Sequence, residues 1–138
     1  MPNKVLTYVD SNILIFAVSQ KNEELKLKAL RMIGDKRREF LASEFLRMET
    51  LPYAIHGKRK KEIAFLEYFF AHHVTRWVQD ERVLFVPATK LIETYNLQLV
   101  DALHLATAME HQADFVTGEK PTKPFHQAYS RCLWITDK

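Results

Sequence analysis

Short apolar runs alternate with longer amphipathic segments along most of the chain. Runs rich in β-branched and aromatic residues predict strands, which we expect at residues 5–9, 39–42, 83–86, 114–117 and 131–135. Apolar positions three and four apart predict helices at residues 11–18, 23–33, 43–55, 58–78, 89–95 and 100–111. Strands separated by helices are typical of βαβ units. We therefore expect an α/β fold with a mainly parallel sheet that helices cover on both faces.

Two of these elements depend on a single pattern. The helix over 58–78 is predicted from one apolar stripe, formed by Ile63, Leu66, Phe70, Val74 and Trp77. The strand over 83–86 is predicted from a continuous apolar run that Pro87 closes. The helix from Ser43 begins at a good N-cap residue, and we expect Pro52 to kink it.

Length and composition are those of an ordinary soluble globular protein. The 138 residues, 47% of them hydrophobic and 27% charged, predict one domain over residues 1–138. No apolar run approaches the roughly 20 residues that span a bilayer, so we expect no membrane partner. Met1 to Val5 shows no secretion signal, and the one cysteine, Cys132, allows neither an internal disulfide nor a multi-cysteine zinc site. These features predict a cytoplasmic protein.

Charge and glycine content narrow the function classes further. The formal net charge of +3 permits a nucleic-acid partner. The three glycines, Gly34, Gly57 and Gly118, cannot form a glycine-rich phosphate loop, which argues against a nucleotide cofactor.

Two acidic residues lie near the carboxyl ends of predicted strands, where a parallel sheet binds ligands, and a third lies on a flanking helix. Asp10 follows the first strand, and Glu119 follows the fourth, two residues after Thr117. Asp101 lies in the first turn of the helix predicted over 100–111. Each has a structural alternative: helix capping for Asp10, a favourable helix dipole for Asp101, and a surface loop for Glu119.

Glu49 is a fourth candidate, because it shares a helix face with apolar Phe45 and Leu46. A charge on a buried stripe costs free energy unless it is paired or binds a metal, so a salt bridge to Arg or Lys is the structural alternative. His104 lies three residues after Asp101 on an apolar helix. A histidine there is more often packed than ligating, and we do not assign it to a metal.

Together, these four carboxylates point to a divalent cation. Crowded carboxylates repel one another and some would become protonated, unless a cation offsets their charge. Their hard oxygen atoms suit Mg²⁺ or Mn²⁺, and the Thr117 hydroxyl would add to an oxygen-rich cluster. Such a cation can activate water and stabilise a departing oxygen in phosphodiester hydrolysis.

The motifs around these acids resemble those of PIN-domain nucleases. Residues 8–15 (Tyr-Val-Asp-Ser-Asn-Ile-Leu-Ile) resemble the family's opening strand motif, and residues 101–108 (Asp-Ala-Leu-His-Leu-Ala-Thr-Ala) its third acidic motif. Residues 43–49 resemble the helix with the second acid, and residues 113–119 stand in the place of the fourth. The size and the order of motifs are similar to those of stand-alone VapC-type toxins of toxin–antitoxin modules.

This resemblance implies a three-layer α/β/α sandwich around a five-stranded parallel sheet. It implies a Mg²⁺- or Mn²⁺-dependent endoribonuclease that leaves 5′-phosphate and 3′-hydroxyl ends, works as a homodimer and is blocked by a cognate antitoxin. Asp10, Glu49 and Asp101 would be metal-binding acids, while Glu119 stands where an aspartate is commoner. The resemblance further implies supporting roles for Thr117, which would orient water, and for Ser11, which follows the first acid.

Lys58, Arg59, Lys60 and Lys61 form a basic run that we interpret as an RNA-backbone contact, with a solvated charge run as the alternative.

Two other functions stay open. A PIN-like module with an impaired metal pocket would bind RNA without cutting it. A phosphoacceptor receiver domain would need an acidic pair after the first strand, where Ser11 follows Asp10, and an aspartate after the third, where the predicted strand ends in Val86 and Pro87.

Overall fold

The sheet at the centre of the molecule has five parallel strands in the order β3-β2-β1-β4-β5. The computed structural model describes residues 3–136; residues 1–2 and 137–138, which the predicted domain includes, lie outside the described part. The strands are β1 (Val5–Val9), β2 (Arg38–Ala42), β3 (Val74–Trp77), β4 (Asp114–Thr117) and β5 (Cys132–Trp134). The predicted α/β fold with a parallel sheet is confirmed.

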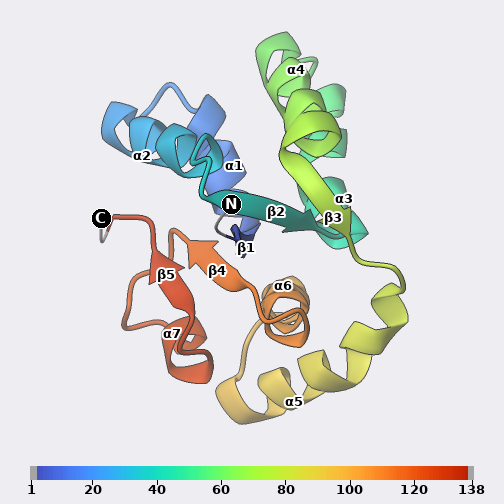
Figure 1. The fold of residues 1–138 in the computed structure, drawn as a ribbon. Helices are drawn as coiled ribbons and strands as arrows, with labels where there is room; N and C mark the ends of the chain where they lie inside the picture. The colour runs from blue at the N-terminus through green and yellow to red at the C-terminus, as the bar shows by residue number, and fades with distance from the viewer. Residues whose placement is uncertain (1–2, 137–138) are drawn as a thin grey trace.

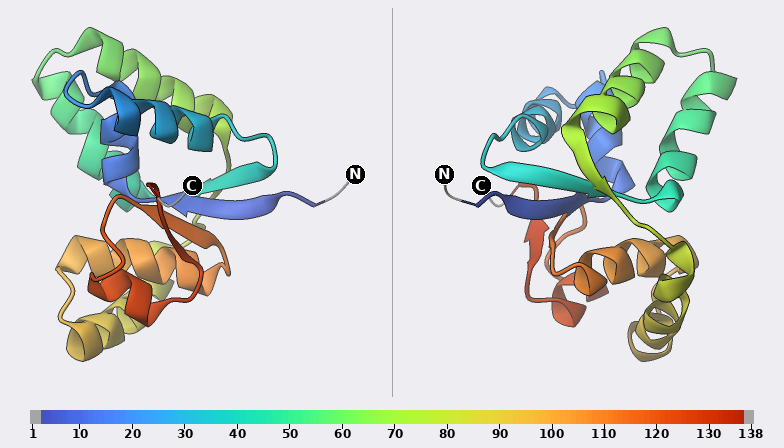
Figure 2. Two further views of the ribbon diagram at one scale, coloured as in Figure 1. Left: turned by 90° about the vertical axis from the view of Figure 1, so that its left-hand side faces the viewer. Right: turned by 45° about the vertical axis from the view of Figure 1, so that its right-hand side comes forward.

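Helices cover both faces of this sheet and complete three layers (Figures 1 and 2). One layer contains α1 (Ser11–Val18), α2 (Glu23–Ile33), α3 (Glu44–His56) and α4 (Lys60–Tyr68). The opposite layer contains α5 (Phe85–Tyr95), α6 (Leu99–Glu110) and α7 (Pro124–Ala128). None of the helices within residues 3–136 combines the length and the apolar character needed to cross a membrane.

The strand order reverses next to β1, and this reversal places the candidate site. From β1 the chain moves outward through β2 to β3, then crosses by α5 and α6 to β4 on the other side of β1. Val9 pairs with Val116, so the carboxyl ends of β1 and β4 lie side by side. Ligands of parallel α/β sheets bind in the crevice at such a reversal.

The helix α6 is buried between the sheet and α5. Every residue from Ala102 to Ala108 is buried, and the helix packs against α5, α3, β1 and β4. Its small side chains at Ala102, Ala106 and Ala108 allow this close approach. Polar groups at the start of α6 are therefore held close to the ends of β1 and β4.

The predicted helix over 58–78 is wrong in its second half. The segment begins as α4, continues through a π-helical turn, η1 (Phe69–His73), and then forms β3. Val74 and Trp77 fit the helical stripe by spacing, but in the fold they pair with Phe40 and Ala42 of β2. The β-branched residues at 74 and 75 fit a strand, and pairing with an otherwise open edge outweighs the helical pattern.

The strand predicted over 83–86 is also wrong. Residues 81–84 form a 3₁₀ turn, η2, that Asp80 caps, and α5 begins at Phe85 instead of Thr89. Pro87 lies in the first turn of α5, where a missing N–H costs nothing. A short apolar run does not distinguish a strand from a helix, and here Val83 and Val86 are mostly exposed. The short helix α7 was not predicted.

Candidate active site

Asp10 joins β1 to α1 and is held by two hydrogen bonds. Its Oδ1 accepts from the backbone N–H of Ser11 at 2.8 Å and caps α1, as the structural alternative required. Its Oδ2 accepts from the hydroxyl of Thr117 at 2.9 Å. Burial raises the pKa of Asp10, while His104 and these two donors oppose the rise. Capping uses one oxygen, so a structural role and a role in the site are compatible.

The end of β4 is fastened to the start of α1. The hydroxyl of Thr117, besides donating to Asp10, accepts from the backbone N–H of Glu119 at 3.0 Å. The backbone N–H of Gly118 donates to Oδ1 of Asn12 at 3.0 Å. A Cβ at Gly118 would lie only 2.6 Å from the nearest ring carbon of Phe16, so the ring would have to move to admit any other residue.

Glu49 projects from α3 toward α6, where it meets His104. Its Oε1 lies 2.6 Å from Nε2 of His104, and its side chain is 34% exposed. The hydrogen bond with His104 is the main cause that lowers the pKa of Glu49; burial opposes it, and the side chain of Ser11 lowers the pKa further. The expected alternative of a salt bridge to Arg or Lys is therefore replaced by a pairing with histidine.

Asp101 lies in the first turn of α6. Burial, followed by the charge of Asp10, raises its pKa to about 6; His104 opposes this rise, and the charges of Glu49 and Glu119 add to it. No hydrogen bond within residues 3–136 reaches its carboxylate. Its raised pKa thus reports one neighbourhood of negative charge that all four predicted acids share.

The donor chemistry of this neighbourhood fits a hard divalent cation. The charges of Asp10, Glu49 and Glu119 all raise the pKa of Asp101, and Glu49 also raises the pKa of Asp10. His104 is the basic side chain among the groups that shift the pKa values of Asp10, Glu49 and Asp101. Within residues 3–136, however, no three acidic, histidine or cysteine side chains already converge on one metal position. The carboxylates of Asp10 and Glu49 are bonded to protein donors instead. The residues thus supply suitable ligand atoms in one region of the fold, although these atoms do not yet form a complete coordination site.

The basic run of the sequence is only partly connected to this region. Arg59 lines a small cavity of about 70 Å³ together with Glu49, and its Nε donates to Glu62 at 2.7 Å. Lys58, Lys60 and Lys61 are exposed. The structure therefore brings Arg59 to the rim of the candidate site, whereas nothing in it assigns a role to the three lysines.

Sequence reasoning missed the polar groups behind the acids. His104, which we did not assign to a metal, is fully buried and contacts Glu49. Tyr8 and Ser43, also fully buried, extend this contact into the core. A tyrosine within a buried strand needs a partner for its hydroxyl, and this rule was the available signal.

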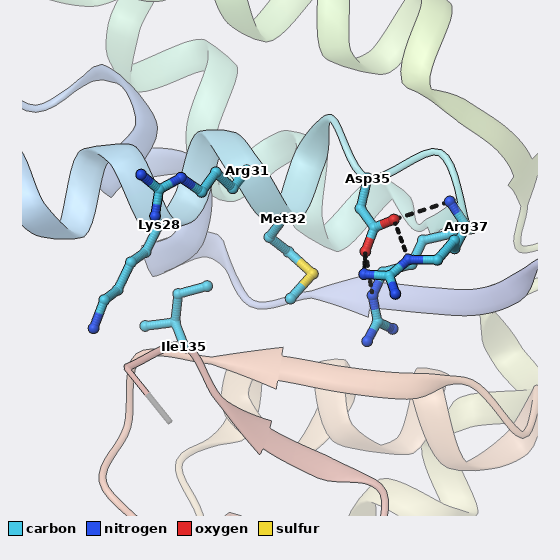
Figure 3. Close-up of a pocket in the computed structure, with 7 residues that line it drawn as sticks. Lys28, Arg31, Met32, Asp35, Arg37 and Ile135 are labelled. Carbon is cyan, nitrogen blue, oxygen red and sulfur yellow. Dashed lines mark hydrogen bonds and ion pairs between the residues drawn. The ribbon is translucent and has the colours of Figure 1, made fainter. Parts of the chain in front are cut away.

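A larger pocket lies elsewhere, between α2 and Ile135 (Figure 3). It has a volume of about 370 Å³ and contains four cationic side chains, among them Arg37 and Arg38. Asp35 binds Arg37 with both carboxylate oxygens, at 3.0 and 3.1 Å, and Asp114 binds Arg38 at 2.9 Å. Because most of this positive charge is already paired, we do not place the functional site here.

A model of the PIN domain family matches residues 7–121, a range that includes all four candidate acids. The chain belongs to the PIN-domain family. Members of this family are typically nucleases that bind a divalent cation. The family excludes the receiver alternative; the observed third strand, which ends at Trp77, also lacks a terminal aspartate.

Similar solved structures agree on the fold. VapBC2 from Rickettsia felis, bound to a promoter DNA fragment, aligns with a TM-score of 0.63 at 12% identity over 94% of this chain and 96% of that chain. FitAcB from Neisseria gonorrhoeae has a TM-score of 0.60 at 12% identity, covering 93% and 96% of the two chains. A toxin–antitoxin complex from Klebsiella pneumoniae has a TM-score of 0.58 at 22% identity, covering 82% and 86%. No curated protein sequence matches the chain.

Proposed function

We propose that this protein is a metal-dependent endoribonuclease and the toxin of a toxin–antitoxin pair. The observation that carries the proposal is the shared negative charge of Asp10, Glu49, Asp101 and Glu119 at the reversal of strand order. A PIN domain with these four acids in one neighbourhood fits the hydrolysis of RNA phosphodiester bonds better than binding alone. Four carboxylates crowded together would repel an RNA phosphate unless a cation bound between them.

The four acids would hold Mg²⁺ or Mn²⁺, as one or two ions. When bound, such a cation supplies Lewis acidity toward the scissile phosphate and the attacking water, and neutralises charge at the leaving 3′-oxygen. Thr117 orients Asp10 through its hydroxyl and also binds the backbone that carries Glu119. Ser11 supports Asp10 through its N–H and Glu49 through its side chain. Glu119 offers a longer arm than an aspartate at the same position.

RNA would approach along the rim that contains Arg59. The exposed Lys58, Lys60 and Lys61 follow Gly57 at the start of α4 and are free to contact the RNA backbone. Their contribution would be independent of RNA sequence, because phosphate contacts carry no base information.

An antitoxin would cover the apolar groove next to Glu49. Phe45, Met48, Tyr53 and Val100 line this groove with Glu49, and its volume is about 210 Å³. Met48 and Tyr53 are 61% and 67% exposed, which is unusual for such large apolar side chains beside an acidic site. A partner segment with apolar anchors and one basic side chain would match both features. The similar toxin–antitoxin complexes support this proposal.

A second copy of the chain would cover the start of α5. Val83, Phe85 and Val86 are 58%, 51% and 65% exposed and lie next to one another in the chain. An exposed apolar patch of this kind favours a homodimer. We propose that the protein acts in the cytoplasm. Replacing Phe85 and Val86 by glutamate should shift the protein toward monomer in sedimentation velocity.

The test of the proposed function is RNA cleavage. The purified protein is incubated with structured RNAs in Mn²⁺, in Mg²⁺ and with a chelator, and the ends of any products are identified. Cleavage that needs the cation and leaves 5′-phosphates supports the proposal. Binding of RNA and cation without any cleavage would favour the RNA-binding module instead.

A further inference from the structure

A chain of buried hydrogen bonds connects the core to Glu49. The Ser43 and Tyr8 hydroxyl oxygens lie 2.8 Å apart, and the Tyr8 hydroxyl lies 2.6 Å from Nδ1 of His104. On the other side of the imidazole, Nε2 lies 2.6 Å from Oε1 of Glu49. Tyr8, Ser43 and His104 are all fully buried, so Glu49 is the end of the chain that reaches the surface.

Which atom donates in each hydrogen bond can be worked out from Glu49, at the surface end of the series, inward to Ser43. The ionised carboxylate of Glu49 can only accept a hydrogen bond, so Nε2 of His104 carries the proton between them. Nδ1 then accepts from the Tyr8 hydroxyl, which burial keeps protonated by raising its pKa. The Tyr8 oxygen accepts in turn from Ser43, whose own oxygen accepts from the backbone N–H of Leu46 at 3.2 Å. Every donor in this series of hydrogen bonds has one acceptor.

This series of hydrogen bonds connects the three elements that position three of the candidate acids. Tyr8 is in β1, which Asp10 directly follows. Ser43 is the N-cap of α3, which carries Glu49, and His104 is one turn after Asp101 in α6. Apolar side chains of similar volume would fill this space with no polar group to satisfy, often without loss of stability. A network that fixes the mutual placement of these three elements gives a reason for polar residues here.

We propose that His104 is a positioning residue that fixes the orientation of the Glu49 carboxylate at the candidate cation site. Tyr8 and Ser43 hold the imidazole, and the imidazole holds Oε1 of Glu49. This inference rests on the proposed function for its purpose. The positioning itself is a property of the metal-free protein and can be tested separately.

Two amide variants separate positioning from packing. In His104→Gln the side-chain amide can reach the place of Nε2 and keep a donor for Glu49. In His104→Asn the shorter amide reaches the place of Nδ1, keeps a partner for Tyr8 and leaves Glu49 without a donor. Leu105→Val, at a fully buried neighbour on the same helix, is the control for a change in packing alone.

The first readout is the side-chain conformation of Glu49 in the metal-free protein, from NMR scalar couplings. We expect one fixed rotamer in the wild type, in His104→Gln and in Leu105→Val, and averaged couplings in His104→Asn. Couplings that do not differ between the two amide variants would overturn the proposal. If neither amide variant folds, Tyr8→Phe provides the same test, because it removes the support of His104; unchanged Glu49 couplings in it would likewise overturn the proposal.

The second readout is the dissociation constant for Mn²⁺ alone, from calorimetry. Loss of a group that orients a metal ligand typically weakens binding about 10–100-fold. We expect a weakening in this range for His104→Asn and recovery in His104→Gln. Equal affinities in the two variants would contradict a role toward the cation. Absence of Mn²⁺ binding in the wild type would instead count against the proposed function, and the NMR result would still decide on positioning.

Discussion

The acidic residues at the two ends of the sheet have different partners. At the amino end, Asp114 accepts from Arg38 and from Arg131, both at 2.9 Å, and Asp35 is bound to Arg37. At the carboxyl end, Asp10, Glu49, Asp101 and Glu119 share one neighbourhood in which His104 is the basic partner.

The pKa values follow this difference. The guanidinium of Arg37 holds the pKa of Asp35 below its usual range, whereas burial and neighbouring acids raise the pKa of Asp101 to about 6. The acids at the amino end are paired with arginines and support the fold. At the carboxyl end, Asp101 is buried among other acids, and its charge costs stability unless a cation binds. We expect such a loss of stability at the carboxyl end of the sheet if this end forms a ligand-binding site.

The largest expected effect is the loss of cleavage in Asp101→Asn or Asp10→Asn. Each variant removes one charge from the candidate cation site while keeping the side-chain volume. We expect RNA cleavage to fall by about 100-fold or more, because loss of one group that stabilises charge in a transition state has this size. Circular dichroism should show an unchanged fold. Full activity in Asp101→Asn would refute the role proposed for it.

The matched change at the other end is Asp114→Asn. It removes the carboxylate that Arg38 and Arg131 both bind at 2.9 Å, and leaves Arg38, whose side chain is 16% exposed, with the longer 3.8 Å contact to Asp35. We expect the free energy of unfolding to fall by about 2 kcal/mol, the size of a charged hydrogen bond, with RNA cleavage per folded molecule unchanged. Urea unfolding measures the first quantity. A loss of cleavage equal to that of Asp101→Asn would remove the contrast between the two ends.

The pH dependence of stability should reveal the crowding of Asp101. Its pKa is about 6 in the folded protein, against 3.8 for an unperturbed aspartate, so the folded state binds this proton more tightly. The resulting stability is fully present below the unfolded pKa and is lost as the pH rises through 6. With a chelator present, Asp101→Asn should therefore gain stability over the wild type between pH 4 and pH 7. After allowance for solvent screening, we expect a gain of about 1 kcal/mol. A difference that does not change with pH would show that Asp101 is not crowded.

The smallest expected effect concerns the basic run. Replacing Lys60 and Lys61 by glutamine should flatten the dependence of RNA affinity on salt, by about 0.7 in slope for each phosphate that is no longer neutralised. Lys4 and Lys36, exposed at the amino end of the sheet, provide a control with the same change of charge. If both double variants show the same slope, Lys60 and Lys61 belong to a solvated surface and not to an RNA-binding surface.

The sequence predicted four of the five strands and missed β3. The positions of β1, β2, β4 and the edge strand β5 were correct to within one residue at each end. The strand β3 was hidden inside an apparent helix, since Val74 and Trp77 satisfy both patterns and only pairing with β2 decides between them. Local patterns do not contain that information.

For the candidate site, the sequence predicted the acids but not what holds them. Asp10 and Asp101 stand in motifs with recognisable neighbours, and the structure places both in one neighbourhood. The contact between His104 and Glu49 joins residues 55 positions apart, and the contact between Tyr8 and His104 joins residues 96 apart. Such pairs follow only from the packing of α3 and α6 against β1, which no local spacing determines.

The central claim, that the carboxyl end of the sheet is a cation site, is tested most directly by thermal unfolding during a Mn²⁺ titration. A ligand that binds only the folded state adds about 2.7 kcal/mol of stability at 100 times its dissociation constant. We expect the melting temperature to rise and saturate in the wild type and equally in Asp114→Asn, and to rise much less in Asp101→Asn. Equal Mn²⁺ stabilisation of Asp101→Asn and the wild type would contradict the account.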